Sequence, residues 1–326
     1  MTKIKRIGVL TSGGDGPGLN PCIRAVTRTA LSKGVEVMGV RRGYTGLIND
    51  EMVPLDARSV GGILGKGGTF LGTTRLPAFK ELRLQRQAVR VLNQASVDGL
   101  VVIGGNGSLT GALALHKLGF PTVGVPGTID NDVGGTDIAI GVDTALNTVL
   151  DAIDKIKDTA SSHQRAFLIE VMGRDCGYLA LMAGIAGGAE MILIPEISTP
   201  LEDVADCLSD AYLRGKAHGI ILVAEGYKPG TQAVLDYLAE HKQELGFSMR
   251  VTVLGHVQRG GSPTAYDRIL ATRLGCAAAE GLLEGKSGLV AGMLGSKIAY
   301  TSLEEAVAAL RPINERLYDI SRMMEL

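Results

Sequence analysis

The stretch LVVIGGNGSLTGALALHKLGFPTVGVPGTIDND, residues 100–132, decides the fold of this chain. It holds two apolar runs, Leu100–Ile103 and Thr122–Val125, separated by a segment with helical character. In a strand–helix–strand unit the parallel strands end at the same edge of the sheet, so the loops that follow them become neighbours. The loop Gly104–Ser108 offers backbone N–H groups that suit phosphate, and Pro126–Asp132 offers two carboxylates that suit a metal ion or a proton to be removed. This combination indicates phosphoryl transfer.

The composition fits a globular protein with two lobes. The chain has 326 residues, of which 45% are apolar and 21% charged, and its length favours two lobes over one. A net charge of −1 argues against a general binder of nucleic acid or anionic membranes. The four cysteines lack Cys-x-x-Cys spacing, so we expect free thiols in a reducing cytosol. With no apolar run long enough for a signal peptide or a membrane span, the expected location is the cytoplasm.

Strand-like runs alternate with helical patterns, which predicts an α/β doubly wound fold. Strands are expected at residues 6–10, 36–40, 100–103, 122–125, 166–171, 191–194, 220–224 and 250–254. Helices are expected at residues 20–32, 143–160, 267–283 and most of 303–325, with an exposed helix at 85–94 and mostly loop, with a short helix, at 55–72. The helix at 143–160 is expected to take the chain into a second lobe, and the helix at 267–283 to return it to the first.

A second glycine-rich loop, Thr11–Gly18, lies between a predicted strand and a predicted helix, as phosphate loops do. It is not a Walker A loop, because no Lys-Ser/Thr pair closes it, and it lacks the G-x-G-x-x-G spacing of dinucleotide sites. A structural turn remains the alternative. Without a loop lysine, arginines have to meet the phosphate charge. Those at strand ends or in loops are Arg75, Arg165, Arg174, Arg250 and Arg259. Any one of them could be a solvated surface residue, but as a cluster they suit a sugar phosphate.

Asp130 and Asp132 lie two residues apart. In an extended stretch this spacing sends both carboxylates to one side. One carboxylate could accept a proton from an attacking hydroxyl while the other holds Mg²⁺, directly or through water. Thr128 could orient the base or bind the incoming phosphoryl group. An Asx-turn with no chemical role is the alternative.

Over nearly its whole length the chain resembles the ATP-dependent 6-phosphofructokinases of the bacterial type, the phosphofructokinase A family. The motifs that carry the resemblance are TSGGDGPGLN (11–20), GGTFLGTTR (67–75), GGNGS (104–108), PGTIDND (126–132), SSHQR (161–165), EVMGR (170–174) and GHVQRGGSPTAYDR (255–268). The resemblance implies two doubly wound α/β lobes, Rossmann-like sandwiches, with the active site in the cleft between them. Residues 1–140 plus 257–306 would form a larger ATP-binding lobe, and residues 141–256 plus 307–326 a smaller lobe that binds fructose 6-phosphate.

The resemblance also implies a reaction and the residues that carry it. Mg-ATP would phosphorylate fructose 6-phosphate at its 1-hydroxyl, a step of glycolysis. The implied catalytic residues are Asp130 as general base, with Thr128, Arg174 and Gly14. The implied sugar site is Thr128, Ile129, Asp130, Met172, Gly173, Arg174, Glu225, His256 and Arg259, with Arg165 and Arg250 supplied by a neighbouring subunit of a homotetramer. The implied ATP site is Gly14, Arg75, Leu76, Gly105, Asn106, Gly107 and Ser108, and the implied metal ligands are Asn106 and Asp132.

Three positions in the glycine-rich loops bear on the phosphoryl donor and on the use of the metal ion. Relatives that use pyrophosphate have Asp and Lys where this chain has Gly107 and Gly127, so the two glycines predict ATP as donor. The family usually has GGDGS, whose Asp binds Mg²⁺, and Asn106 offers an oxygen without the charge. We expect metal use to weaken by roughly tenfold or more. The alternative is a catalytically weak or regulatory sugar-phosphate-binding homologue. A different kinase with a GGDG-like loop, for NAD or lipid, is disfavoured by the arginine set and by the GHVQRGG stretch.

The family binds ADP or phosphoenolpyruvate as effectors between subunits. The residues that match or nearly match that site are Arg24, Arg28, Lys157, Glu190, Arg214, Lys216 and His218. Ala57, Gly62 and Ala217 stand where relatives have charged residues. With fewer charges available, effector regulation is expected to be altered or absent.

Overall fold

The computed structural model describes residues 4–308 and 311–324. Contacts divide the chain into two compact units: the large unit, Met1–Thr144 with Arg259–Arg311, and the small unit, Ala145–Gln258 with Pro312–Leu326. The chain first leaves the large unit after Thr144, where we expected residue 140. It re-enters this unit at Arg259, where we expected residue 257, and leaves it again after Arg311, where we expected residue 306.

A mixed sheet forms the centre of the large unit, with the order β11-β10-β5-β4-β1-β2-β3 among the described residues. Its strands are β1 (Arg6–Thr11), β2 (Glu36–Val40), β3 (Met52–Leu55), β4 (Gly99–Gly104), β5 (Thr122–Pro126), β10 (Leu289–Leu294) and β11 (Lys297–Ser302). The inner strands pair in parallel, while β3 and β11 join the two edges antiparallel. Because β4 and β5 are buried on both faces, they read as continuous apolar runs in the sequence.

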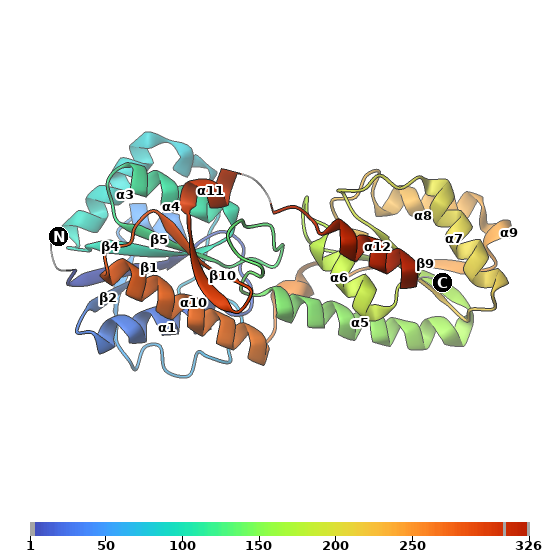
Figure 1. Ribbon diagram of the computed structural model, residues 1–326, viewed down its shortest axis with the longest axis horizontal. Helices are drawn as coiled ribbons and strands as arrows, with labels where there is room; N and C mark the ends of the chain where they lie inside the picture. The colour runs from blue at the N-terminus through green and yellow to red at the C-terminus, as the bar shows by residue number, and fades with distance from the viewer. Residues whose placement is uncertain (1–3, 309–310, 325–326) are drawn as a thin grey trace. The chain divides into compact units, whose positions relative to one another are not determined.

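Helices cover both faces of this sheet (Figure 1). On one face α1 (Leu19–Ser32) packs against α10 (Ala265–Leu283). The other face carries α2 (Gly43–Ile48), α3 (Leu82–Gln94), α4 (Asn106–Lys117) and α11 (Leu303–Ala308), with the 3-10 helix η1 (Pro77–Lys80) before α3.

Two sequence-based expectations are wrong in this unit. We expected α3 to be exposed, but its Leu84, Ala88 and Val91 are buried in the core because they share one face of an amphipathic helix. We also expected a short helix within residues 55–72, which form the end of β3 and a series of turns.

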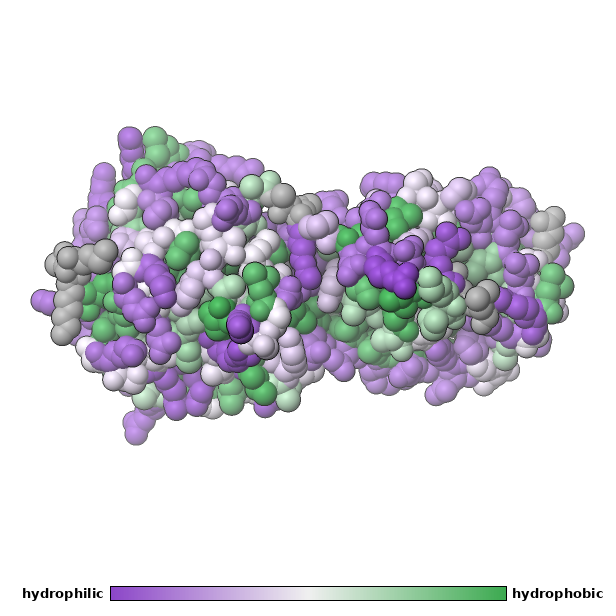
Figure 2. Space-filling model, viewed as in Figure 1, coloured by the Kyte–Doolittle hydropathy of each residue, from purple (hydrophilic) through white to green (hydrophobic). Residues whose placement is uncertain are grey.

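The small unit repeats the pattern on a parallel sheet, with the order β7-β8-β6-β9 among the described residues. Its strands are β6 (Arg165–Val171), β7 (Met191–Leu193), β8 (Gly219–Ala224) and β9 (Ser248–Val253). One face carries α5 (Val142–His163), α6 (Tyr178–Gly187) and α12 (Glu315–Met324), and the other α7 (Leu201–Leu213), α8 (Thr231–Glu240) and α9 (Lys242–Leu245). Figure 2 shows apolar residues gathered over α6, beside the hydrophilic surface of α12.

Both units therefore confirm the predicted α/β class, with helices on both faces of each sheet. Within the described residues no helix is long and apolar enough to cross a membrane.

The first turn of α5 is held inside the large unit by Asp267 of α10. The Asp267 carboxylate is fully buried and accepts hydrogen bonds from Gly141 N (2.9 Å), Thr144 N (2.8 Å) and Thr144 Oγ1 (2.5 Å). Burial nevertheless raises the pKa of Asp267, because the lost hydration outweighs these bonds. A buried polar contact thus fixes where the helix that leaves the large unit begins.

Candidate active site

Three loops follow β1, β4 and β5 at the carboxyl edge of the large sheet, and hydrogen bonds join them. Ser12 N donates to Ile103 O (3.1 Å), and Gly127 N donates to Gly104 O (3.0 Å). The hydroxyl of Ser108, a buried residue, donates to Ser12 O (2.8 Å). The loops at Thr11–Gly18, Gly104–Ser108 and Pro126–Asp132 are therefore in contact, as parallel strand order requires.

The segment that carries Arg75 is docked on the first of these loops. Gly13 N donates to Thr74 O (3.3 Å), and Thr73 Oγ1 donates to Gly13 O (2.9 Å). Arg75 is exposed, and Leu76, which precedes η1, is partly buried. The structure thus places the predicted nucleotide residue Arg75 beside a glycine loop from a distant part of the chain.

Helix α4 begins within the second loop, with Gly105 as its N-cap. The first turn of a helix has backbone N–H groups without intrahelical partners and a partial positive charge, both suited to phosphate. Tyr44 holds this turn in place, because its hydroxyl donates a hydrogen bond to Ser108 O (2.7 Å). Burial raises the pKa of Tyr44, so the hydroxyl keeps its proton and remains a donor.

Gly107 and Gly127, the two positions expected to select the donor, have different surroundings. A Cβ built on Gly107 meets nothing within 4 Å, so a side chain there would enter open space. A Cβ on Gly127 would lie 2.8 Å from Leu19 Cδ2 and 3.2 Å from Ile103 Cγ2, both in the core. Packing therefore favours glycine at 127 whatever the donor, and the expected preference for ATP depends on Gly107.

Asp130 is buried next to an arginine. Its side chain is 3% exposed, and its Oδ1 lies 3.9 Å from Nη2 of Arg259. Nη1 of Arg259 donates to Asp15 O (3.1 Å), and a Cβ on Gly14 would come within 2.7 Å of the same nitrogen. Because a buried charge is costly without a partner, the guanidinium compensates the carboxylate. Arg259, predicted as a sugar-phosphate residue, thus joins Asp130 to the first glycine loop.

The loop around Asp130 is bent, so the assumption that Asp130 and Asp132 lie in an extended stretch is wrong. Asn131, between them, has left-handed backbone (φ 55°). Its Oδ1 accepts from Ala139 N (2.9 Å) and its Nδ2 donates to Asp137 O (3.3 Å). Asn131 was missed, although asparagine tolerates this conformation better than most residues. The spacing of two therefore does not place both carboxylates on one side.

Neighbouring residues complete the shape of this loop. Thr128 N donates to Ile140 O (3.1 Å), and Ile140 N donates to Pro126 O (3.0 Å). Thr128 Oγ1 accepts from Asp130 N (3.2 Å), so the threonine positions the aspartate. Ile129 is fully buried, and its side chain serves packing. Nδ2 of Asn106, from the start of α4, donates to Asp132 O (3.2 Å).

In the small unit the predicted sugar residues Met172, Gly173 and Arg174 directly follow β6. Glu225, just past β8, accepts from Gly173 N (3.2 Å) and Arg174 N (2.6 Å) with one oxygen. Arg174 is held in left-handed backbone (φ 53°), an uncommon conformation for this residue type. The exposed His256 lies in the 3-10 helix η2 (Gly255–Arg259). Within this unit, Glu225 and the loop after β6 are brought together.

Arg165 lies at the opposite end of the same strand. It begins β6, while Arg174 follows the carboxyl end, and seven residues in a strand span about 20 Å. Arg250, on the neighbouring edge strand β9, stands opposite Phe167 and is therefore nearer to the Arg165 end. One copy of the small unit thus does not bring Arg165 to the loop of Arg174.

Several predicted effector residues have structural partners in the small unit. Glu190 is 5% exposed, accepts from Ile220 N, and lies 3.6 Å from Lys216 Nζ through its other oxygen. Lys157 Nζ donates to Gly187 O, and Nδ1 of His218 is 2.8 Å from Ser161 Oγ. Arg24 and Arg28 belong to α1 of the large unit.

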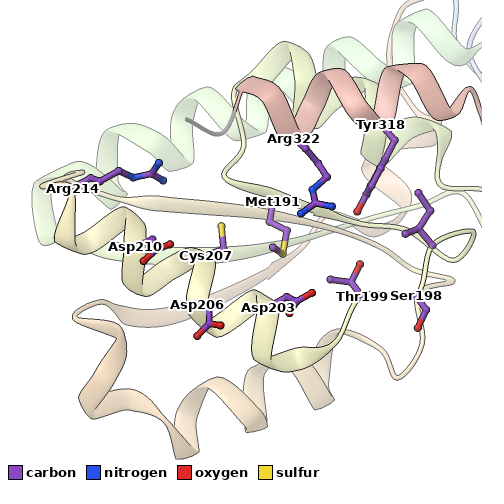
Figure 3. A pocket seen from close by; sticks show the side chains of 11 residues that line it. Met191, Ser198, Thr199, Asp203, Asp206, Cys207, Asp210, Arg214, Tyr318 and Arg322 are labelled. Atoms are coloured by element: carbon purple, nitrogen blue, oxygen red, sulfur yellow. The ribbon is translucent and has the colours of Figure 1, made fainter.

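Arg214 lines a cavity of about 460 Å³ in the small unit (Figure 3). Helix α7 contributes Asp203, Asp206 and Asp210, and α12 contributes Tyr318 and Arg322. Apart from Arg214, none of the residues that line this cavity was predicted to bind a ligand.

Comparison with known proteins agrees with these features. A model of the phosphofructokinase family matches residues 6–282. The chain is 51% identical over 324 residues to the ATP-dependent 6-phosphofructokinase of Listeria welshimeri serovar 6b, covering 99% of this chain and 100% of that one.

The chain belongs to the phosphofructokinase family. It is also 51% identical over 322 residues to the ATP-dependent 6-phosphofructokinase of Clostridium acetobutylicum, covering 98% of this chain and 99% of that one. The solved structure of phosphofructokinase from Saccharomyces cerevisiae superposes with a TM-score of 0.87 at 38% identity. That match covers 98% of this chain and 47% of the yeast chain, so this phosphofructokinase spans about half the length of that structural relative. The family resemblance seen in the motifs is confirmed.

Proposed function

We propose that this chain transfers the γ-phosphoryl group of ATP to the 1-hydroxyl of fructose 6-phosphate, giving fructose 1,6-bisphosphate in glycolysis. The observation that carries the proposal is the 51% identity along the full length of relatives named ATP-dependent 6-phosphofructokinase. The contact between two glycine loops and a loop with a buried aspartate supports it, because phosphoryl transfer needs a phosphate cradle beside a base.

The large unit would hold the nucleotide. The phosphates would lie against backbone N–H groups of the first glycine loop and of the first turn of α4, around Gly14, Gly105, Gly107 and Ser108. Arg75 and Leu76 would complete the site from the docked segment. The open space at Gly107 supports ATP as donor, because nothing there would crowd an α-phosphate.

Asp130 would be the general base for the sugar 1-hydroxyl. Thr128 Oγ1 holds its backbone N–H, and Arg259 stands beside its carboxylate. Both contacts restrict where the carboxylate can lie, and positioning is the main source of catalysis in this reaction class. Gly14 contributes by its lack of a side chain, because a Cβ there would displace Arg259.

The residues fit Mg²⁺ bound together with ATP. Magnesium prefers oxygen ligands and usually takes one or two from the protein, with phosphates and water supplying the others. Asp132 has a carboxylate and Asn106 an amide oxygen, and Asn106 is tied to Asp132 through its nitrogen, so its oxygen faces away from that carbonyl. When bound, the metal ion would neutralise charge on the phosphates.

The small unit would hold the sugar through Met172, Gly173, Arg174, Glu225 and His256. The distance along β6 supports a neighbouring subunit as the source of Arg165 and Arg250. The edge strand β9 also exposes Val251 (37%) and Val253 (59%), which suits an interface between subunits. We therefore propose a homo-oligomer, as a tetramer, in the cytoplasm.

Effector control by ADP or phosphoenolpyruvate would act on residues that already have partners in the small unit. Glu190 and Lys216 are engaged with each other, and Glu190 also with Ile220 N. A ligand at these residues would have to replace those contacts.

A coupled assay of the purified protein tests the proposal directly. Fructose 6-phosphate is supplied with either ATP or pyrophosphate across a series of Mg²⁺ concentrations. We expect product with ATP, dependence on Mg²⁺, and little or no product with pyrophosphate. Turnover with pyrophosphate alone would overturn the donor, and no fructose 1,6-bisphosphate with either donor would overturn the reaction.

A further inference from the structure

The side chain of Asn106 connects two loops of the large unit. Asn106 is the first residue of α4, and its Nδ2 donates to the backbone oxygen of Asp132 (3.2 Å) in the loop that carries Asp130. Arg311 N donates to the same oxygen (3.2 Å). This carbonyl therefore accepts two hydrogen bonds, the number that its lone pairs allow.

Several hydrogen bonds within its own segment shape the rest of the Asp130 loop. Asn131 is bonded to Asp137 and Ala139, and the base of the loop is closed by the bonds of Ile140 to Thr128 and Pro126. These contacts fix the shape of the loop. The Asn106 amide joins the loop to the start of α4, two residues from Asp130.

The chemistry of the contact requires a donor at position 106. A backbone carbonyl can only accept, so the side-chain atom that faces it must carry a hydrogen. An aspartate of the same shape would place a charged oxygen against the carbonyl oxygen of Asp132. Such a pair of acceptors repels unless a cation lies between them.

We propose that Asn106 is a positioning residue that holds the Asp130 loop against the start of α4 in the absence of metal. The amide does by hydrogen bonding what a carboxylate at this position could do only with a bound cation. The loops are thereby assembled before Mg-ATP arrives. The catalytic part of this inference rests on the proposed function, but the assembly of the loops does not.

Hydrogen exchange of the full-length protein tests the assembly without any substrate. Wild type, Asn106→Ala and Asn106→Asp are compared in EDTA and then with MgCl₂, and the readout is amide exchange in peptides from residues 126–133. Loss of the contact should speed this exchange roughly five- to tenfold in both variants in EDTA. Added Mg²⁺ should restore protection in Asn106→Asp and not in Asn106→Ala. Strand β8 of the small unit, residues 219–224, is the internal reference.

A matched control separates the loop contact from a general effect on α4. Thr110, one turn further along, donates from Oγ1 to Asn106 O (2.8 Å) and is exposed. Thr110→Ala should change exchange within α4 and leave residues 126–133 as in wild type. The midpoint of thermal unfolding in EDTA should fall by about 2–4 °C for Asn106→Asp and recover with Mg²⁺.

Kinetics adds the catalytic readout. Asn106→Ala should lower kcat at saturating Mg-ATP at least tenfold, with a smaller change in KM for fructose 6-phosphate. Wild-type exchange at residues 126–133 in both variants would overturn the inference, as would equal recovery of the two variants with Mg²⁺. If wild type makes no fructose 1,6-bisphosphate while the exchange results hold, the proposed function fails and the positioning role stands.

Discussion

The glycine loops of the large unit and the loops of the small unit that are proposed to bind the sugar differ in how completely one chain builds them. In the large unit, buried hydroxyl and backbone bonds join loops from three strands, such as Ser108 to Ser12 and Gly127 to Gly104. In the small unit, Arg174 and Glu225 are exposed, and Arg165 lies at the other end of β6.

This difference suits different ligands in the two units. A preformed cradle suits a nucleotide, whose phosphates are recognised by backbone groups that must not move. The small unit offers charged side chains on loops, and in the proposed oligomer a second copy would complete the set. Each of the following predictions tests one side of this comparison.

Replacing Asp130, the proposed general base, should have the largest effect. Asp130→Asn keeps the shape of the side chain but removes its ability to accept a proton, so kcat should fall about 10²–10⁴-fold. KM for ATP should stay within a few-fold, since the glycine loops are untouched. The coupled assay measures both. Asp151→Asn, which changes an exposed carboxylate of α5, is the control and should behave as wild type. An unchanged kcat in Asp130→Asn would remove the base role.

Mixing two variants that each lack one arginine should test whether two chains contribute to the proposed sugar site. Arg165→Ala and Arg174→Ala should each raise KM for fructose 6-phosphate or lower kcat by roughly ten- to hundredfold, because each would lose a proposed charge-assisted phosphate contact. Hybrid oligomers formed by co-refolding the two should regain part of the activity, because some sites then combine an intact Arg174 with an intact Arg165 from the other chain. Mixtures no more active than the separate variants would show that one chain supplies both arginines.

The two glycines of the large unit should respond in opposite ways. Gly127→Ala should lower the free energy of unfolding by about 1–3 kcal/mol, because its Cβ would press on Leu19 and Ile103. Gly107→Ala lies in open space within α4 and should leave stability unchanged or raise it by up to about 1 kcal/mol. Its effect should appear instead in KM for ATP. Denaturant unfolding and nucleotide titrations separate the two outcomes, and equal destabilisation would contradict the packing argument.

A smaller effect should appear in the pH dependence of stability. The pKa of Asp267 is raised above its ordinary value of 3.8 by burial. The folded state then holds the proton more tightly than the unfolded state, so this contribution is present below the ordinary pKa and is lost as pH rises through the raised one. Asp267→Asn cannot ionise, so the unfolding midpoint of wild type should decline relative to the variant as pH rises from about 4. Parallel pH profiles would contradict this assignment.

The parts of the fold that sequence predicted are those with strong local patterns. Runs such as Leu100–Ile103 are apolar on both faces, and they appear as strands within one or two residues. The β10–β11 hairpin was missed, although a Gly295-Ser296 pair between two apolar runs is a hairpin signal. Strand β3 was also missed, because Pro54 disfavours a strand anywhere except at an edge, which is where β3 lies.

The sequence predicted which residues belong to the candidate site better than it predicted the contacts between them. Its residues were found through motifs, but contacts between distant segments were not readable from them. The position of Arg259 beside Asp130 depends on a return of the chain after more than one hundred residues. The bend at Asn131 depends on bonds to Asp137 and Ala139. Both are tertiary features that local spacing does not encode.

The length of β6 has a consequence for how the protein would behave on dilution. In the proposed oligomer, sugar binding is linked to subunit association, and nucleotide binding is not. As the protein concentration falls below the dissociation constant of the assembly, affinity for fructose 6-phosphate should be lost while affinity for ATP persists. The same linkage means that fructose 6-phosphate should promote assembly, so the abundance of the substrate would help to set the fraction of chains that are active.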